Sequence, residues 1–317
     1  MKRRHGMIRH PLEPVFLFIR PASPLNPGVQ FQQITLVGVG LLGGSLGLAV
    51  KQRGMAGRVV GLVRRPESVA ECHGLGVVDE ATLDAEAAIK DADLIVHCAP
   101  VSQMRALTEK FLPFMKQGAI VTDVGSVKAC VAEDLEKAIA DAGGCFVGSH
   151  PMAGGEQAGV VHSRGDLFEK ANVVVTPTPN SNAESVRSVS HFWHALGANV
   201  LSVDPATHDA LVARSSHLPH VAAAALAGAV LREGQPDELG KVCGPGFRDT
   251  TRIASGSPSL WRDIVMQNQE NVAAGIEDLI RDLEAFKTQL EAGDAAAVEA
   301  FFQNAKEQRD DWNTKRP

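Results

Sequence analysis

From residue 33 onward, short apolar runs alternate with segments whose apolar positions follow the helical period. The apolar runs occupy residues 34–39, 58–63, 92–99, 118–124, 144–149, 172–178 and 199–203. They are continuously apolar and rich in β-branched residues, which is typical of strands buried on both faces of a parallel sheet. The pattern predicts an α/β domain with a doubly wound parallel sheet over residues 33–204.

The pattern changes after Asp204. Residues 205–233 are rich in alanine without strand-like alternation, residues 259–293 form one long amphipathic pattern, and residues 294–312 form another. These segments predict an all-α domain over residues 205–317. Residues 1–32 are expected to be a disordered or loosely ordered tail, because residues 11–27 are rich in proline. Their apolar run at 15–19 is too short for the ~7–15 residues of a secretory h-region.

Composition narrows the class of protein. The chain has 317 residues, 44% hydrophobic and 21% charged, which suits roughly two globular domains. With 31 basic and 37 acidic residues the net charge is −6, which disfavours a nucleic-acid partner. The uncharged stretch 34–50 is short for a membrane span and holds five glycines. The five cysteines have no metal or redox spacing, so a soluble, cytoplasmic protein is expected.

A glycine motif stands between the first predicted strand and the first predicted helix. Gly38 and Gly40 are followed by Leu41, Leu42 and Gly43, in the order G-x-G-x-x-G. In a strand–turn–helix context this spacing predicts a Rossmann dinucleotide site, because glycines let the backbone approach the pyrophosphate at a helix N-terminus. The alternative is a glycine-rich packing turn without a ligand. The many other strands that fit the sheet favour the cofactor site, and Pro100, at another strand end, is expected to line it.

The end of the second strand indicates which cofactor binds. An acidic residue there usually binds the ribose 2′-hydroxyl of NAD, but the chain has Val63 followed by Arg64 and Arg65. Two guanidinium groups suit the 2′-phosphate of NADP. NADP is therefore favoured over NAD, and the alternative is that both arginines are solvated loop charges.

Five motifs occur in a fixed order, the first of which contains the glycine motif: GVGLLGGS (38–45), DVGSVK (123–128), GSHPMAGGE (148–156), HDALVARSSHLPH (208–220) and FRDTTRIASGSPSLWRDI (247–264). Together they resemble the prephenate/arogenate dehydrogenase family of tyrosine biosynthesis, from about residue 33 to 317. The resemblance implies a homodimer with its active site between a Rossmann domain and a helical dimerisation domain. It also implies NAD(P)-dependent oxidative decarboxylation, of prephenate to 4-hydroxyphenylpyruvate or of arogenate to tyrosine.

The resemblance also implies site residues. His150 holds the position of the base that takes the hydroxyl proton as hydride leaves, and Ser126 matches the serine between hydroxyl and nicotinamide. Ser126 also reads as the N-cap of the helix that follows it. Arg252 matches the arginine that holds a substrate carboxylate, or else forms a surface ion pair. Expected around the substrate side chain are Ser216, His217, His220 and, as partner of the amine of arogenate, Glu156.

Other classes of protein are less consistent with these residues. A β-hydroxyacid dehydrogenase would need a catalytic lysine on the first helix of the second domain, and residues 205–230 contain none. A non-catalytic dinucleotide sensor would not require His150, Ser126 and Arg252 together. The spacing of His208, Asp209, His217 and His220 matches no usual zinc signature, so no metal site is expected. Small-molecule substrate and a second copy of the chain are the expected partners.

Overall fold

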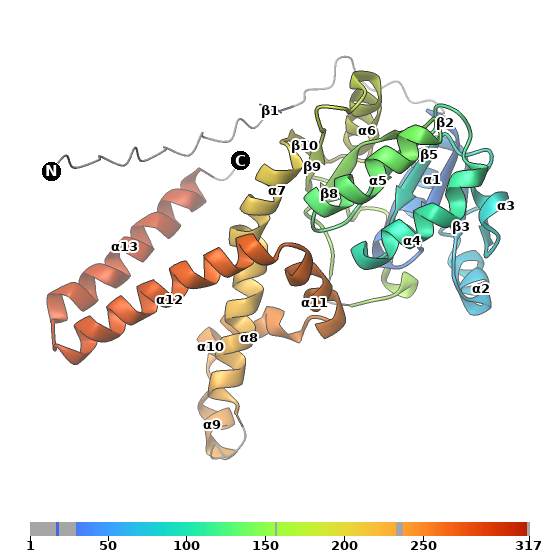
Figure 1. Ribbon diagram of the computed structural model, residues 1–317. Coiled ribbons are helices and arrows are strands. Elements are labelled where there is room, and N and C mark those ends of the chain that lie inside the picture. The colour runs from blue at the N-terminus through green and yellow to red at the C-terminus, as the bar shows by residue number, and fades with distance from the viewer. Residues whose placement is uncertain (1–16, 19–29, 156, 233–236, 316–317) are drawn as a thin grey trace, which may run out of the picture.

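The computed structural model describes residues 17–18, 30–155, 157–232 and 237–315. Figure 1 shows a sheet domain with helices on both sides and a helical part that extends away from it, beginning with α7 and α8. The active-site candidates of the sequence therefore fall on two structurally different parts of the chain.

The sheet domain contains a six-stranded sheet in the order β4-β3-β2-β5-β6-β7, in which every pair is parallel. This is the Rossmann strand order. From β2 the following strands are added first on one side (β3, β4) and then on the other (β5, β6, β7), and ligands of such sheets bind where the order reverses, between β2 and β5. The predicted fold class is confirmed. The strands are β2 (Phe31–Val37), β3 (Ala56–Leu62), β4 (Glu80–Thr82), β5 (Leu94–His97), β6 (Ile120–Asp123) and β7 (Cys145–Phe146).

Two hydrophobic clusters, one on each face, explain why the strands are continuously apolar. On β2, Ile34 and Leu36 belong to the cluster under one set of helices, whereas Val37 belongs to the cluster under the other set. The first set is α1 (Leu41–Gln52), α2 (Pro66–Gly74) and α6 (Ala183–Ala195). The second is α3 (Ala85–Ile89), α4 (Val101–Phe111) with the 3₁₀ turn η1 (Leu112–Phe114), and α5 (Ala129–Asp141).

The expectation of one parallel sheet is wrong for the last strands. A second sheet has the order β1-β10-β9-β8, with β8 (Gly148–Pro151), β9 (Asn172–Thr176), β10 (Asn199–Ser202) and β1 (Leu17–Phe18). Strand β9 runs antiparallel to β8, because the described residues between them, 152–155 and 157–171, hold only the 3₁₀ turn η2 (Val160–His162) and no helix that would cross back over the sheet. The predicted strand at 144–149 is divided between β7 and β8.

After β10 the described chain is entirely helical. Its elements are α7 (Pro205–Val212), the π-helical turn η3 (Ala213–His217), α8 (Leu218–Val230), α9 (Asp237–Val242), α10 (Pro245–Thr251), the 3₁₀ turn η4 (Arg252–Ser255), α11 (Pro258–Gln267), α12 (Gln269–Glu291) and α13 (Ala295–Thr314). The single helix expected over 259–293 is interrupted at Asn268, whose buried side chain bonds to Asp209 and His217 rather than continuing the helix surface. No helix in the described ranges is long and apolar enough to cross a membrane.

Helix α1 packs tightly enough that one of its glycines can be tested for stability. A Cβ at Gly47 would lie 2.0 Å from the carbonyl oxygen of Val77, which belongs to the backbone and cannot rotate away. We expect Gly47→Ala to lower the free energy of unfolding by about 1–3 kcal/mol. Gly74→Ala is the matched control, because nothing lies within 4 Å of its Cβ. Denaturant unfolding that gives the two variants equal stability would contradict the packing argument.

Candidate active site

The glycine turn between β2 and α1 is shaped to receive a negatively charged group. Gly38 has a φ of +92°, and its Cβ would lie 3.0 Å from the Ala99 nitrogen; a Cβ at Gly43 would lie 2.3 Å from the Gly38 oxygen. These two glycines are required by the turn itself. At Gly40, by contrast, a Cβ would meet nothing within 4 Å. The motif therefore leaves open space directly in front of the helix, where a pyrophosphate would lie.

Among the described residues, no side chain caps the start of α1 or the start of α4. Helix α1 begins after Gly40 at Leu41 and Leu42, has no side-chain cap and has no acidic residue in its first turn. Helix α4 follows Pro100 and also lacks a side-chain cap. Five other helices, α3, α6, α7, α11 and α13, are capped by an Asp, Asn or Ser side chain. Uncapped helix starts at the reversal point of the sheet fit a phosphate ligand.

Arg64 and Arg65 lie directly after β3 and are exposed, whereas Val63 before them is buried. Strand β3 is the neighbour of β2 in the sheet, so both guanidinium groups follow the strand end next to the glycine turn. Their placement is compatible with contact to the ribose end of a dinucleotide, and the Val63 position offers no carboxylate for a ribose hydroxyl.

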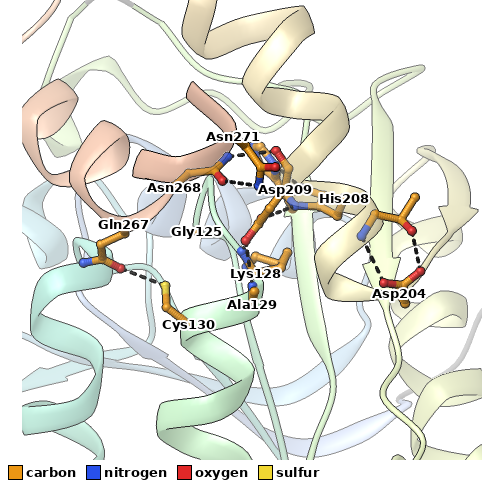
Figure 2. A network of polar contacts seen from close by, with 12 residues as sticks. Gly125, Lys128, Ala129, Cys130, Asp204, His208, Asp209, Gln267, Asn268 and Asn271 are labelled. Carbon is orange, nitrogen blue, oxygen red and sulfur yellow. Dashed lines mark hydrogen bonds and ion pairs between the residues drawn. The ribbon is translucent and has the colours of Figure 1, made fainter. Parts of the chain in front are cut away.

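His150 is at one end of a series of hydrogen bonds that joins the sheet domain to the helical part. It lies on β8, is 9% exposed, and its Nδ1 is 2.9 Å from Nε2 of His208 on α7. His208 Nδ1 is 2.8 Å from Oδ1 of Asp209. The Asp209 carboxylate in turn accepts hydrogen bonds from the backbone amides of Lys128 and Ala129 at the start of α5, at 2.8 and 2.9 Å (Figure 2).

Burial keeps these histidines neutral. Burial lowers the pKa of His150 well below its ordinary value, and the nearby His208, Lys128 and His217 lower it further. Burial also lowers the pKa of His208, against the opposing effect of Asp209. At neutral pH His150 therefore carries a lone pair on one ring nitrogen, which is what a proton acceptor needs.

A buried ion pair holds the two strand ends that carry Ser126 and His150. Lys128 is 1% exposed, and its ammonium group binds the Asp123 carboxylate and, at 3.0 Å, the backbone oxygen of Ser149. Asp123 also accepts hydrogen bonds from the backbone amides of Gly125 and Ser149. The pair thus fixes the loop after β6 against β8. The sequence reasoning missed it, although both residues are in the DVGSVK motif.

Ser126 is half-buried in this loop, and its hydroxyl makes no hydrogen bond with any residue that the structure describes. The interpretation of Ser126 as a helix N-cap is wrong. Helix α5 begins at Ala129, its N-cap residue is Lys128, and its first amides are bound by Asp209 from α7. The Ser126 hydroxyl therefore remains available to a ligand.

The SHLPH motif forms an aromatic cluster with Trp261. The His220 ring stacks on Trp261 with centroids 3.6 Å apart, and its Nδ1 donates to the Ser216 backbone oxygen at 2.9 Å. His217 is buried and lies edge-on to Trp261 at 6.2 Å. Its Nδ1 accepts from Asn268, so its Nε2 carries the hydrogen, yet within the described chain this buried atom has no partner. Burial lowers the pKa of His217 to about 4.

Arg252 and Glu156 are the two other residues expected to contact the substrate. Arg252 is exposed at the start of η4, which packs against α8, the helix that carries His220. Glu156 lies outside the described residues. Ser216 and His217 lie on η3 and His220 on α8, which directly follow α7, the helix whose His208 bonds to His150 on β8. In the part of the chain that the structure describes, no group of three His, Cys, Asp or Glu is arranged to hold a metal ion.

In the sequence, His208 and Asp209 belong to a family motif and raise the possibility of a metal site that their spacing disfavours, but nothing there indicates their contact with His150. Their adjacency in the HDALVARSSHLPH motif was visible, but the direction in which each side chain points depends on how α7 packs on α5. Asn268 was missed for the same reason, because the amphipathic pattern continues across it.

Comparison with known proteins places the chain in a family context. The model of the prephenate dehydrogenase nucleotide-binding domain matches residues 46–202, and that of the prephenate dehydrogenase dimerization domain matches residues 204–304. A curated relative, prephenate dehydrogenase of Bacillus subtilis, is 32% identical over 87% of this chain and 75% of its own length.

Two solved structures are similar over most of the chain. Prephenate dehydrogenase from Aquifex aeolicus, in complex with hydroxyphenyl propionate and NAD⁺, is 33% identical with a TM-score of 0.82, covering 88% of this chain and 98% of that one. Synechocystis arogenate dehydrogenase is 30% identical with a TM-score of 0.76, covering 88% and 99%.

The buried histidines predict how stability depends on pH. Burial lowers the pKa of His97 to about 3, so in the folded protein it stays neutral while in the unfolded chain it gains a proton below about pH 6.5. The contribution of neutral His97 to the free energy of unfolding is therefore complete above pH 6.5 and is lost as the pH falls below that value. We expect His97→Gln to remove about 1 kcal/mol of the stability difference between pH 7 and pH 5.5. Urea unfolding at both pH values measures this, and an unchanged difference would contradict it.

Proposed function

Because this chain belongs to the prephenate dehydrogenase family, we propose that it catalyses the NAD(P)-dependent oxidative decarboxylation of prephenate or arogenate, a step of tyrosine biosynthesis. The observation that carries the proposal is His150, a neutral imidazole at the junction of the two domains, with one ring nitrogen bonded to His208 and the other free to accept a proton. The relatives named above act on prephenate or arogenate, and the assay must decide between these substrates.

The reaction requires a proton to leave the substrate hydroxyl. We assign this proton to Nε2 of His150, and we assign to the Ser126 hydroxyl the alignment of the substrate hydroxyl beside it. A bound nicotinamide would accept the hydride that leaves the ring carbon bearing this hydroxyl. The ring carboxylate then departs as CO₂, and the ring becomes aromatic. Near-perfect alignment matters here, because correct placement of reacting groups accounts for a large part of such rate enhancements.

The substrate carries two carboxylates, which need donors. We propose Arg252 for one of them, and Ser216, His217 and His220 for the side-chain end. The Nε2–H of His217 supports this assignment, since a buried donor without a partner among the described residues costs free energy that a ligand acceptor would recover. We retain Glu156 as the proposed partner of the amine of arogenate.

For the cofactor, the glycine turn and the uncapped starts of α1 and α4 support a nicotinamide dinucleotide at Gly38, Gly40, Leu41, Leu42, Gly43 and Pro100. We propose that Arg64 and Arg65 favour NADP, because Val63 stands where a carboxylate usually binds the ribose of NAD and the two guanidinium groups after it suit a 2′-phosphate.

We propose that the protein is a homodimer. Helix α8 is apolar around its circumference, yet only Ala223 is buried in the single chain. Large apolar side chains on α12 and α13 are also exposed, among them Ile280, Leu283, Leu290 and Phe302. A helical part that leaves this much apolar surface uncovered fits the dimerization domain of the family model that it matches. The five cysteines are all free thiols, which fits the cytoplasm as the proposed compartment.

Substitution of His150 tests its role as the proposed base. We expect His150→Asn to lower kcat by about 10²- to 10⁴-fold with little change in KM, because the loss falls on the transition state. The absorbance at 340 nm, followed with prephenate or arogenate and with NADP or NAD, measures both constants. Near-normal turnover of the variant would remove His150 from the mechanism.

Arg252→Gln provides the contrast in the same assay. Removing a carboxylate partner that binds ground state and transition state alike is expected to raise KM with a smaller change in kcat. If His150→Asn and Arg252→Gln had the same kinetic effect, the separate roles assigned to them would be wrong.

The cofactor preference gives a further prediction. We expect the wild-type protein to have the lower KM for NADP, and Arg64→Ala to raise that KM by about 10-fold or more, since a hydrogen bond to a charged group contributes about 1.5–3 kcal/mol. The KM for NAD should change little and is the internal control. Equal use of both cofactors by the wild type would contradict the assignment.

A further inference from the structure

The state of His150 depends on which of its ring nitrogens carries the hydrogen. A neutral imidazole has one N–H and one lone pair, and only the lone pair can accept a proton. Nδ1 of His150 faces Nε2 of His208 at 2.9 Å, and its Nε2 bonds to no residue of the described chain. If the hydrogen were on Nε2, His150 would present a donor to the substrate and could not act as a base.

Asp209 determines which atom is the donor in each hydrogen bond between Asp209, His208 and His150. Its Oδ1 accepts from the Lys128 amide at 2.8 Å, and its Oδ2 accepts from the Ala129 amide at 2.9 Å. These amides can only donate, so both carboxylate oxygens act as acceptors at the start of α5. His208 Nδ1, which is 2.8 Å from Oδ1, must therefore be the donor.

The remaining bonds follow from this one. Burial disfavours a second proton on His208, so its Nε2 carries a lone pair when Nδ1 carries the hydrogen. The partner of that lone pair is His150 Nδ1, which must then be an N–H donor. The lone pair of His150 is left on Nε2. The reverse arrangement would set two lone pairs against each other between His208 and Asp209.

We propose that His208, held by Asp209, is a positioning residue that fixes His150 in the tautomer with an unprotonated Nε2. His208 acts on His150 alone and touches no reacting atom. The angle of 66° between the two rings, with centroids 5.1 Å apart, places His208 at the edge of His150, where it restrains ring rotation as well as the tautomer. The kinetic consequence of this inference rests on the proposed function, whereas the tautomer itself does not.

Two substitutions of His208 separate hydrogen bonding from packing. In His208→Gln the side-chain oxygen can stand where Nε2 stands and accept from His150, while His208→Leu fills similar space without an acceptor. We expect His208→Leu to lower kcat by at least about 10-fold, within the 10²- to 10⁴-fold range of general-base catalysis, with KM changed less than about threefold. His208→Gln should recover most of this loss. Asp209 is less suitable for the test, because it also holds α5.

A spectroscopic measurement tests the tautomer directly in the wild-type protein. Protonated and unprotonated ring nitrogens give well-separated ¹⁵N resonances, so ¹⁵N-histidine-labelled protein should show His150 with the hydrogen on Nδ1. The His150→Asn variant identifies the signal by its absence. In His208→Leu the Nε2–H form of His150 should appear, and in His208→Gln it should not.

The outcomes are distinct. Wild-type His150 with its hydrogen on Nε2 would overturn the inference, as would equal kcat losses in the Leu and Gln variants or a kcat for His208→Leu within about threefold of wild type. A variant that fails to fold, recognised by its melting temperature, leaves the wild-type spectrum as the deciding measurement. A wild type without dehydrogenase activity would refute the proposed function while the spectrum would still test the tautomer.

Discussion

The structure depends on one carboxylate at the junction of its two parts. Asp209 lies on α7, the first helix of the helical part, yet both of its carboxylate oxygens accept hydrogen bonds from amides at the start of α5 in the sheet domain. Its backbone oxygen accepts from Asn268, at the interruption between α11 and α12 (Figure 2). Asp209 thus caps α5, which has no side-chain cap of its own, and orients His208. It also holds Asn268, the residue between α11 and α12. Loss of the carboxylate would leave buried amides unsatisfied in addition to freeing His208.

The different ways in which the helices begin locate the site. The helices that follow the central strands of the sheet point their N-termini at the same edge. Helix α5 is closed by Asp209, whereas α1 and α4 have no side-chain cap. Uncapped amides at the reversal point of the sheet are the positive partial charges that a dinucleotide phosphate requires, and the capped α5 places Ser126 and Lys128 beside them.

The sequence predicts the parts that depend on local pattern. The glycine turn, five of the six strands of the parallel sheet and the change to helices after residue 204 follow from spacing and periodicity, whereas the short strand β4 (Glu80–Thr82) is not predicted. The family motifs indicate His150. The sequence does not predict features that depend on how distant elements meet. The antiparallel return of β9, the interruption at Asn268 and the cap of α5 each depend on a partner far away in the chain, such as Asp209, which is 80 residues from Ala129. Ser126 has the right residue type for an N-cap, but a better acceptor from another element takes that role.

The electrostatics of the junction explain why a neutral base can work next to a buried lysine. Lys128 is bound to Asp123, and Asp209 faces the positive end of α5, so the fixed charges beside His150 are largely compensated. Without Asp123, the Lys128 charge would stand unpaired beside the imidazole and would oppose a proton on His150 more strongly than it does in the intact pair. In the proposed reaction, the positive charge on His150 would be stabilised by its hydrogen bond to His208, which is itself bonded to Asp209. The proposed partners of the substrate carboxylates, Arg252 and the SHLPH histidines, come instead from the helical part of the chain.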